Sequence, residues 1–99
     1  MLEGCVLAVI AEGETYGYEI LTRLERSGFE ALLEGTLYPA PTRLEKKGLV
    51  VCRKAKSPYG PIRKYYSIME DGMAALVAFR ANDAKITAAA DTVLQRGIE

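Results

Sequence analysis

Hydrophobic positions recur at helical spacing over the first half of the chain. One face of a first predicted helix carries Leu2, Val6, Val9 and Ile10. Gly13 is placed to end that helix, and Thr15 is a candidate N-cap for a second one, which Gly28 closes. A third amphipathic stretch ends before Gly48. The pattern therefore predicts three short helices in succession.

After the third helix the hydrophobic period changes to two. Residues 49–53 and 63–68 read as strands, and the segment 57–61 between them is dense in turn residues. Pro58 and Pro61 make the tip stiff and unable to pair onward, which suits a projecting arm. We expect a β-hairpin here.

A long helix is predicted next, at about residues 71–96, with Ser67 and Glu70 as a candidate capping box. Its heptad-like stripe consists of Leu76, Phe79, Asp83, Ile86, Ala90 and Val93. About 26 residues span ~39 Å, more than a domain of this size covers with its own body. We expect the stripe to form a homodimer interface; the alternative is packing entirely on the chain's own helices.

Two prolines complicate the start of the third helix. If that helix begins at Glu34, Pro39 lies near the limit of the first turn and Pro41 lies well inside. If it begins near Tyr38, both prolines fall where the amides have no helical partner. The sequence predicts either this late start or a kink between Leu37 and Pro41, with Pro41 on the inward face.

Charge is distributed unevenly, although the chain has no net charge. Residues 1–41 hold seven acidic and two basic side chains, whereas residues 42–66 hold eight basic and one acidic. The net charge of +7 on that middle segment, interleaved with tyrosines, favours a polyanionic partner. A merely solvated charged face is the alternative.

The sequence offers few residues suited to catalysis, metal binding or insertion into a membrane. The sequence has no histidine, so Ser-His-Asp triads, Cys-His dyads and imidazole zinc sites are excluded. We expect Cys5 and Cys52 to be small buried hydrophobes and not nucleophiles, and we predict no enzyme activity, metal or cofactor. The longest apolar run, residues 5–11, is far short of the ~20 residues that cross a bilayer. We therefore expect a soluble cytoplasmic protein without a membrane partner.

The order of elements predicts a mainly α protein with a small β-hairpin: a winged helix-turn-helix DNA-binding domain over residues 1–68 and a C-terminal dimerisation helix over residues 69–99. In that architecture the third helix enters the major groove of double-stranded DNA and the hairpin wing follows the backbone. Side chains expected to contact DNA are Thr36, Tyr38, Thr42, Arg43 and Lys46 on the helix, and Lys54, Lys56, Arg63 and Lys64 on the wing.

Four stretches carry a resemblance to a known family: YGYEI at 16–20, EGTLYPA at 34–40, RLEKKGL at 43–49 and RKYYSIMEDG at 63–72. In this combination the chain resembles the PadR family of bacterial transcriptional regulators, in its short form with one C-terminal helix. The resemblance implies a dimeric repressor that binds a two-fold operator, and release from DNA by a phenolic acid or a hydrophobic drug-like effector. It also adds Tyr16 as a candidate phosphate contact, with simple packing as the alternative.

The sequence departs from the family pattern at Leu33, Pro41, Met69 and Asp83. Asp83 stands where drug-binding members present an aromatic side chain to a pore at the dimer interface. We hypothesise that its carboxylate borders a wet cavity there and disfavours flat hydrophobic ligands. The second proline keeps an alternative function open, a winged-helix protein-interaction module with weak or no DNA binding.

Overall fold

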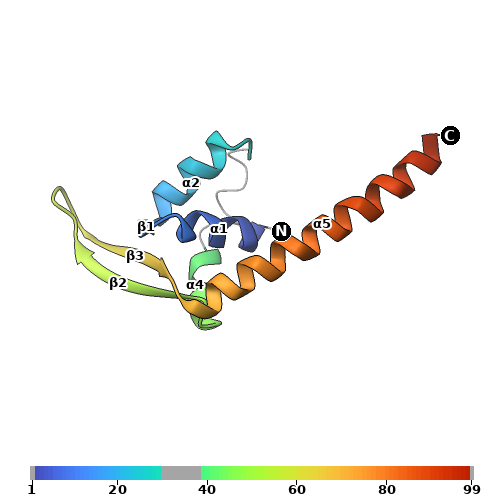
Figure 1. Ribbon diagram of the computed structural model, residues 1–99. Helices are drawn as coiled ribbons and strands as arrows, with labels where there is room; N and C mark the ends of the chain where they lie inside the picture. Colours follow the sequence, from blue (N-terminus) through green and yellow to red (C-terminus); the bar gives the residue numbers. More distant parts are fainter. Residues whose placement is uncertain (1, 30–38, 99) are drawn as a thin grey trace.

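The computed structural model describes residues 2–29 and 39–98, and it has an antiparallel sheet beside a set of helices (Figure 1). The elements in chain order are α1 (Leu2–Ala11), β1 (Thr15–Tyr16), α2 (Gly17–Arg26), α4 (Ala40–Lys46), β2 (Val50–Lys56), β3 (Ile62–Ile68) and α5 (Glu70–Ile98). The predicted fold class, mainly helical with a winged hairpin and a long last helix, is confirmed.

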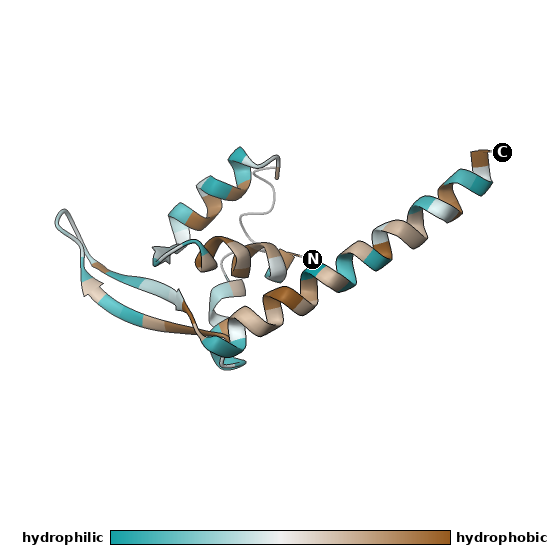
Figure 2. Ribbon diagram, viewed as in Figure 1, coloured by the Kyte–Doolittle hydropathy of each residue, from teal (hydrophilic) through white to brown (hydrophobic). Residues whose placement is uncertain are grey.

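The core is built around α1. This helix contacts α2, α4, α5 and β3, so it is apolar on most of its surface and not on one stripe alone (Figure 2). The buried apolar side chains are Val6, Leu7, Val9, Ile10, Ile20, Leu21, Leu24, Ala40, Leu44, Val50 and Tyr66. Cys5 and Cys52, predicted to be buried, are half-buried free thiols that pack against this core.

The described part of the third predicted helix begins at Ala40. Pro39 is its N-cap, and Pro41 occupies the second helical position, so both prolines lie where a missing amide costs little. The first backbone bond of the helix runs from the Arg43 amide to the Pro39 carbonyl, at 3.1 Å. Pro41 is buried, as predicted, beside Leu44. The choice between a late start and a kink between Leu37 and Pro41 depends on residues before Pro39, which lie outside the described residues.

The sheet has three strands in the order β1-β3-β2, all antiparallel. The hairpin strands are longer than the predicted segments, since β2 continues to Lys56. The sequence analysis missed β1, whose two residues pair with Tyr65 and Tyr66 of β3. Tyr66 is buried and Tyr65 lies on the other face, as the alternation of a strand requires.

Both capping predictions are wrong for the same reason. Thr15 is in β1, the N-cap of α2 is Tyr16, and the Thr15 hydroxyl donates instead to Glu19 Oε1 at 3.0 Å. Ser67 is in β3, and its hydroxyl lies 3.4 Å from Glu14 Oε2, while α5 begins only at Glu70. In each case the hydroxyl residue lies in a β-strand, whereas the local sequence pattern predicted a helix cap.

Helix α5 crosses α1 and then projects away from the body of the protein (Figure 1). Its 29 residues span about 43 Å. Near its start, Gly72 approaches the Leu49 carbonyl and the ring of Phe79 lies against Gly4, so a methyl group on either glycine would overlap these neighbours. Further along, the exposed apolar side chains are Ile86, Val93, Leu94 and Ile98.

Candidate nucleic-acid interface

The wing carries its cations on two faces, which the strand register separates. Lys54 pairs directly with Lys64, and Lys56 pairs with Ile62, so the three lysines share one face of the hairpin. This is also the face of Val50 and Tyr66, which are buried beside the helices. The three lysines are exposed and have no acidic partner among the described residues. Lys54, Lys56 and Lys64 are called the wing lysines below.

Arg63 lies on the opposite face, where it belongs to a chain of stacked side chains. Its guanidinium carbon is 4.3 Å from the centroid of Tyr16, which meets Tyr65 edge-on at 5.7 Å. Arg53 in turn lies over Tyr65 at 4.9 Å and binds Glu14 through two nitrogens, at 2.7 and 2.6 Å. The ion pair lowers the pKa of Glu14 and raises that of Arg53, in both cases chiefly through the side-chain hydrogen bonds. Tyr16 therefore packs within the fold, and whether it also contacts phosphate stays a prediction.

Helix α4 presents a mixed surface. Lys46 is exposed without an acidic partner among the described residues, and Pro39 is exposed beside it in helical projection. Thr42 is half-buried beside Tyr66, whose pKa is raised mainly by burial and lowered in part by interaction with the Thr42 side chain. Thr36 and Tyr38, the other predicted contacts of this helix, lie outside the described residues.

Arg43 is exposed but engaged. Its Nε donates to Glu3 Oε1 of α1 at 2.8 Å, and Lys47 donates to Oε2 of the same carboxylate at 2.8 Å. These two bonds are the main reason that the pKa of Glu3 lies below its ordinary value. Sequence reasoning missed both acidic partners, Glu3 and Glu14; their signal was the acidic excess of residues 1–41.

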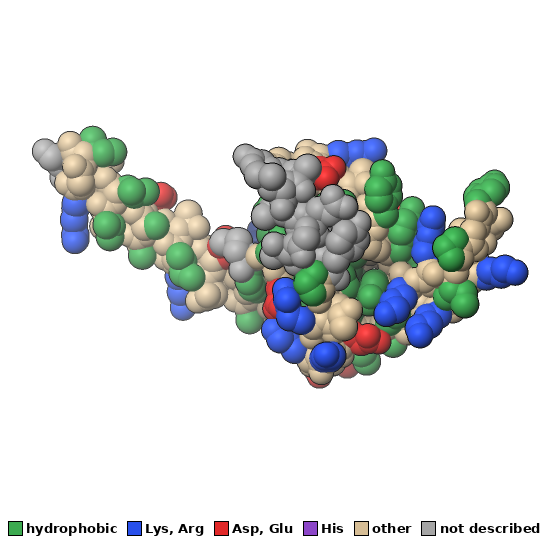
Figure 3. All heavy atoms as spheres, turned by 180° about the vertical axis from the view of Figure 1, so that it is seen from behind, with side chains coloured by type: hydrophobic (Ala, Val, Ile, Leu, Met, Phe, Trp, Pro, Cys, Tyr) green, Lys and Arg blue, Asp and Glu red, His purple; other side chains and the backbone are tan. Residues whose placement is uncertain are grey.

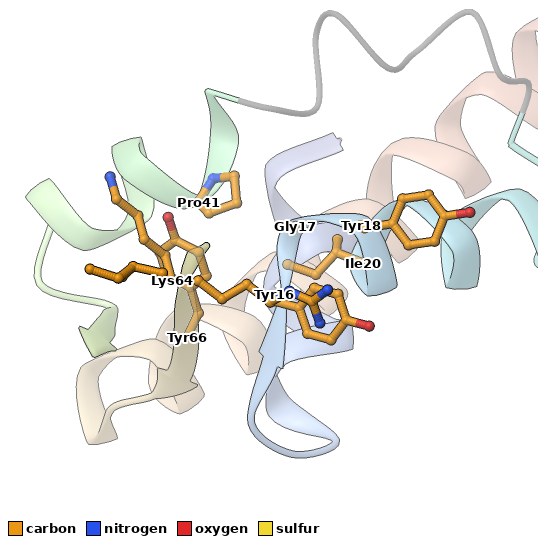
Figure 4. Close-up of a pocket in the computed structure, with 9 residues that line it drawn as sticks. Tyr16, Gly17, Tyr18, Ile20, Pro41, Lys64 and Tyr66 are labelled. Atoms are coloured by element: carbon orange, nitrogen blue, oxygen red, sulfur yellow. The ribbon is translucent and has the colours of Figure 1, made fainter. Parts of the chain in front are cut away.

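A notch of about 340 Å³ opens where the short strand β1 stops beside β3. Arg63 borders it from β3. Lys64 also borders it from β3, Pro41 from α4, Tyr16 from β1 and Tyr18 from the start of α2 (Figure 4). The notch thus joins the wing, the proline-led helix and the N-terminus of α2. Viewed from behind, lysine and arginine side chains lie along the projecting wing and on the lower part of the adjoining body, where acidic side chains lie among them (Figure 3).

The predicted dimer stripe divides into two parts. Leu76 and Phe79 are half-buried against α1, where they border a groove of about 220 Å³ together with Cys5, Ala8 and Asp83. One carboxylate oxygen of Asp83 is buried and has no hydrogen-bond partner among the described residues. Ile86, Ala90 and Val93 lie further along α5 and are exposed.

The described residues offer neither a metal site nor a membrane span. Residues 2–29 and 39–98 contain no group of three acidic or cysteine side chains arranged to hold a metal ion. Within the same residues, α5 and the other helices are too short or too polar to traverse a lipid bilayer.

In residues 2–29 and 39–98 a hairpin wing lies next to three short helices and is followed by a long helix, an arrangement that defines a winged helix-turn-helix protein with a C-terminal extension. The sequence profile of the transcriptional regulator PadR-like family matches residues 6–78. The chain therefore belongs to the PadR-like family of transcriptional regulators, which confirms the resemblance found in its sequence.

Solved structures agree with this assignment. A PadR-like transcriptional regulator from Bacillus cereus is 37% identical, with a TM-score of 0.78 over 95% of this chain and 91% of that chain. A transcriptional regulator from Streptococcus is 36% identical, with a TM-score of 0.79 over 93% of this chain and 90% of that chain. PadR from Bacillus subtilis, solved in complex with operator DNA, is 21% identical, with a TM-score of 0.71 over 80% of this chain and 46% of that chain; this similarity concerns the fold.

Proposed function

We propose that this protein is a cytoplasmic, dimeric transcriptional repressor that binds double-stranded DNA sequence-specifically and is released by a small aromatic or hydrophobic effector. DNA binding is supported by the shared face of the wing lysines on a hairpin whose strand β2 packs against α4. Lysine contacts to phosphate supply affinity, while α4 is the element suited to the major groove. The operator complex of the Bacillus subtilis relative supports the same partner.

Dimer formation is supported by α5. An apolar face at Ile86, Val93, Leu94 and Ile98 is exposed on a helix that extends beyond the body of one protomer. Pairing with a second copy would remove that face from water and would place two wings on one duplex, as a two-fold operator requires. Residues 69–99 would then be the dimerisation helix, and residues 1–68 the DNA-binding domain.

The effector part of the proposal rests on the groove beside α1 and α5. Leu76 and Phe79 give it apolar walls, and Asp83 supplies an unpaired carboxylate oxygen among the described residues. In a dimer this groove would lie near the interface, where the carboxylate would disfavour a flat hydrophobic ligand. An aromatic molecule that presents a hydrogen-bond donor to this carboxylate, such as the hydroxyl of a phenol, is the class of effector we propose. We propose no catalytic role for the protein.

The function is tested by titrating the protein against fluorescein-labelled duplex from its own upstream intergenic DNA, with a random-sequence duplex as control. We expect tighter binding to the intergenic DNA, steep weakening as salt rises, and release by one member of a panel of phenolic acids and drugs. Absence of binding to either duplex at 50 mM salt would instead support the protein-interaction module.

A further inference from the structure

Arg43 of the candidate interface and Lys47, the C-cap of α4, are already bound to an anion within the protein. Glu3, in the first turn of α1, uses one carboxylate oxygen for Arg43 and the other for Lys47, each at 2.8 Å. These are the only ion pairs between α1 and α4 in the described residues. The two cations lie one helical turn apart, on the flank of α4 that faces α1.

The pairing is accessible to an external competitor. The side chains of Arg43 and Lys47 are 48% and 56% exposed, so neither is enclosed by the protein. Arg43 donates to Glu3 through Nε, which leaves its two terminal nitrogens for other acceptors. A phosphate oxygen is chemically equivalent to the carboxylate oxygen as an acceptor for these groups, and the duplex presents such oxygens in a row.

We propose that Glu3 is an internal competitor for DNA phosphate, which occupies Arg43 and Lys47 and thereby limits both the affinity and the number of counterions released on binding. This inference rests on the proposed DNA-binding function. If Glu3 occupies Arg43 and Lys47, the principal phosphate contacts are the wing lysines and Lys46. These four lysines lack acidic partners among the described residues. Arg43 and Lys47 contribute only after exchange of the Glu3 carboxylate for a phosphate.

If Glu3 has only a structural role, removal of its charge should change DNA affinity in the opposite direction. If its bonds served only to hold α4 in position against α1, loss of the carboxylate would disorder the helix and weaken DNA binding. If Glu3 competes with phosphate, loss of its charge frees two cations beside a polyanion and strengthens binding. The sign of one substitution therefore distinguishes the two roles.

The test uses the full chain and a labelled 30-base-pair random-sequence duplex, because non-specific binding reports the electrostatic contribution. We expect Glu3→Gln to tighten binding roughly three- to tenfold at 0.1 M salt and to steepen the slope of log Kobs against log salt by about 1 to 2. The matched control is Glu12→Gln, which removes a carboxylate that binds Arg23, outside the basic segment. Glu12→Gln should change the slope of log Kobs against log salt by less than half as much as Glu3→Gln does.

If thermal unfolding shows that Glu3→Gln does not fold, a double variant tests the same proposal. Arg43→Gln/Lys47→Gln removes cations that the proposal regards as occupied, so its slope should differ from wild type by less than about 1. The proposal would be overturned if folded Glu3→Gln bound DNA more weakly than wild type, or if its slope were unchanged. It would also be overturned if the double variant lost the full slope that two phosphate contacts contribute. Failure of the wild-type protein to bind the duplex would overturn the DNA-binding function itself.

Discussion

Gly4→Ala tests how α5 is fixed to the DNA-binding domain. Gly4 is buried on α1, and a Cβ there would overlap three ring carbons of Phe79 on α5. Overpacking of this kind costs roughly 1–3 kcal/mol. Replacing glycine with alanine inside a helix contributes about 1 kcal/mol in the other direction. We therefore expect a net loss of up to about 2 kcal/mol, which lowers the unfolding temperature of a domain of this size by up to roughly 10 °C.

The assay is thermal unfolding followed by circular dichroism, at one fixed protomer concentration because association shifts the apparent stability. Gly97→Ala is the matched control, since a Cβ at Gly97 on α5 meets nothing within 4 Å. That variant should be neutral or slightly stabilised. Phe79→Leu should recover part of the loss caused by Gly4→Ala, with a coupling energy of about 1 kcal/mol. If Gly4→Ala stabilises the protein as Gly97→Ala does, the close contact between α1 and α5 is refuted.

Three further predictions concern the ion pairs, the core and the stripe. Because the pKa of folded Glu3 and that of Glu14 lie below the ordinary 4.5, their stabilising effect is complete above that pH and is lost as pH falls through the lowered values. Urea unfolding from pH 7 to 3 should therefore show a smaller acid-induced loss in Glu3→Gln than in wild type; an equal loss would contradict this. Tyr66→Phe removes a buried hydroxyl that interacts with the Thr42 side chain and should cost about 1 kcal/mol in the same urea assay, whereas no change would mean that this interaction contributes nothing. Asp83→Trp should raise dimer stability in sedimentation equilibrium, or raise affinity for a hydrophobic drug in fluorescence titration; if neither rises, Asp83 is not at the interface.

The elements in which apolar residues recur at regular spacing were predictable from sequence, whereas the two-residue strand β1 was not. The helices at the two ends of the chain and the hairpin follow directly from the spacing of apolar residues and turn residues. Strand β1 has only two residues, and it exists because Tyr65 and Tyr66, about fifty positions later, pair with it. Thr15 and Ser67 were assigned to helix caps because a local pattern cannot register such pairing.

The candidate interface was predictable in its composition and less so in its geometry. The basic excess of residues 42–66 falls on α4 and the wing, the two elements of the candidate interface. Strand alternation, which places Tyr65 and Tyr66 on opposite faces of β3, also places Arg63 and Lys64 on opposite faces and could have predicted their separation. The capture of Arg43 by Glu3 connects residues forty positions apart, so no spacing rule reveals it, and only the packing of α4 on α1 does.

The central claim is that the wing lysines contact DNA phosphate, and a salt titration of Lys54→Gln/Lys56→Gln/Lys64→Gln tests it most directly. The control is Lys85→Gln, which removes an exposed cation from α5, away from the wing. The account predicts that the triple variant flattens the slope of log Kobs against log salt by roughly 2 to 3 per bound protomer, while the control leaves it unchanged. A triple variant that binds duplex with the wild-type slope would contradict the account.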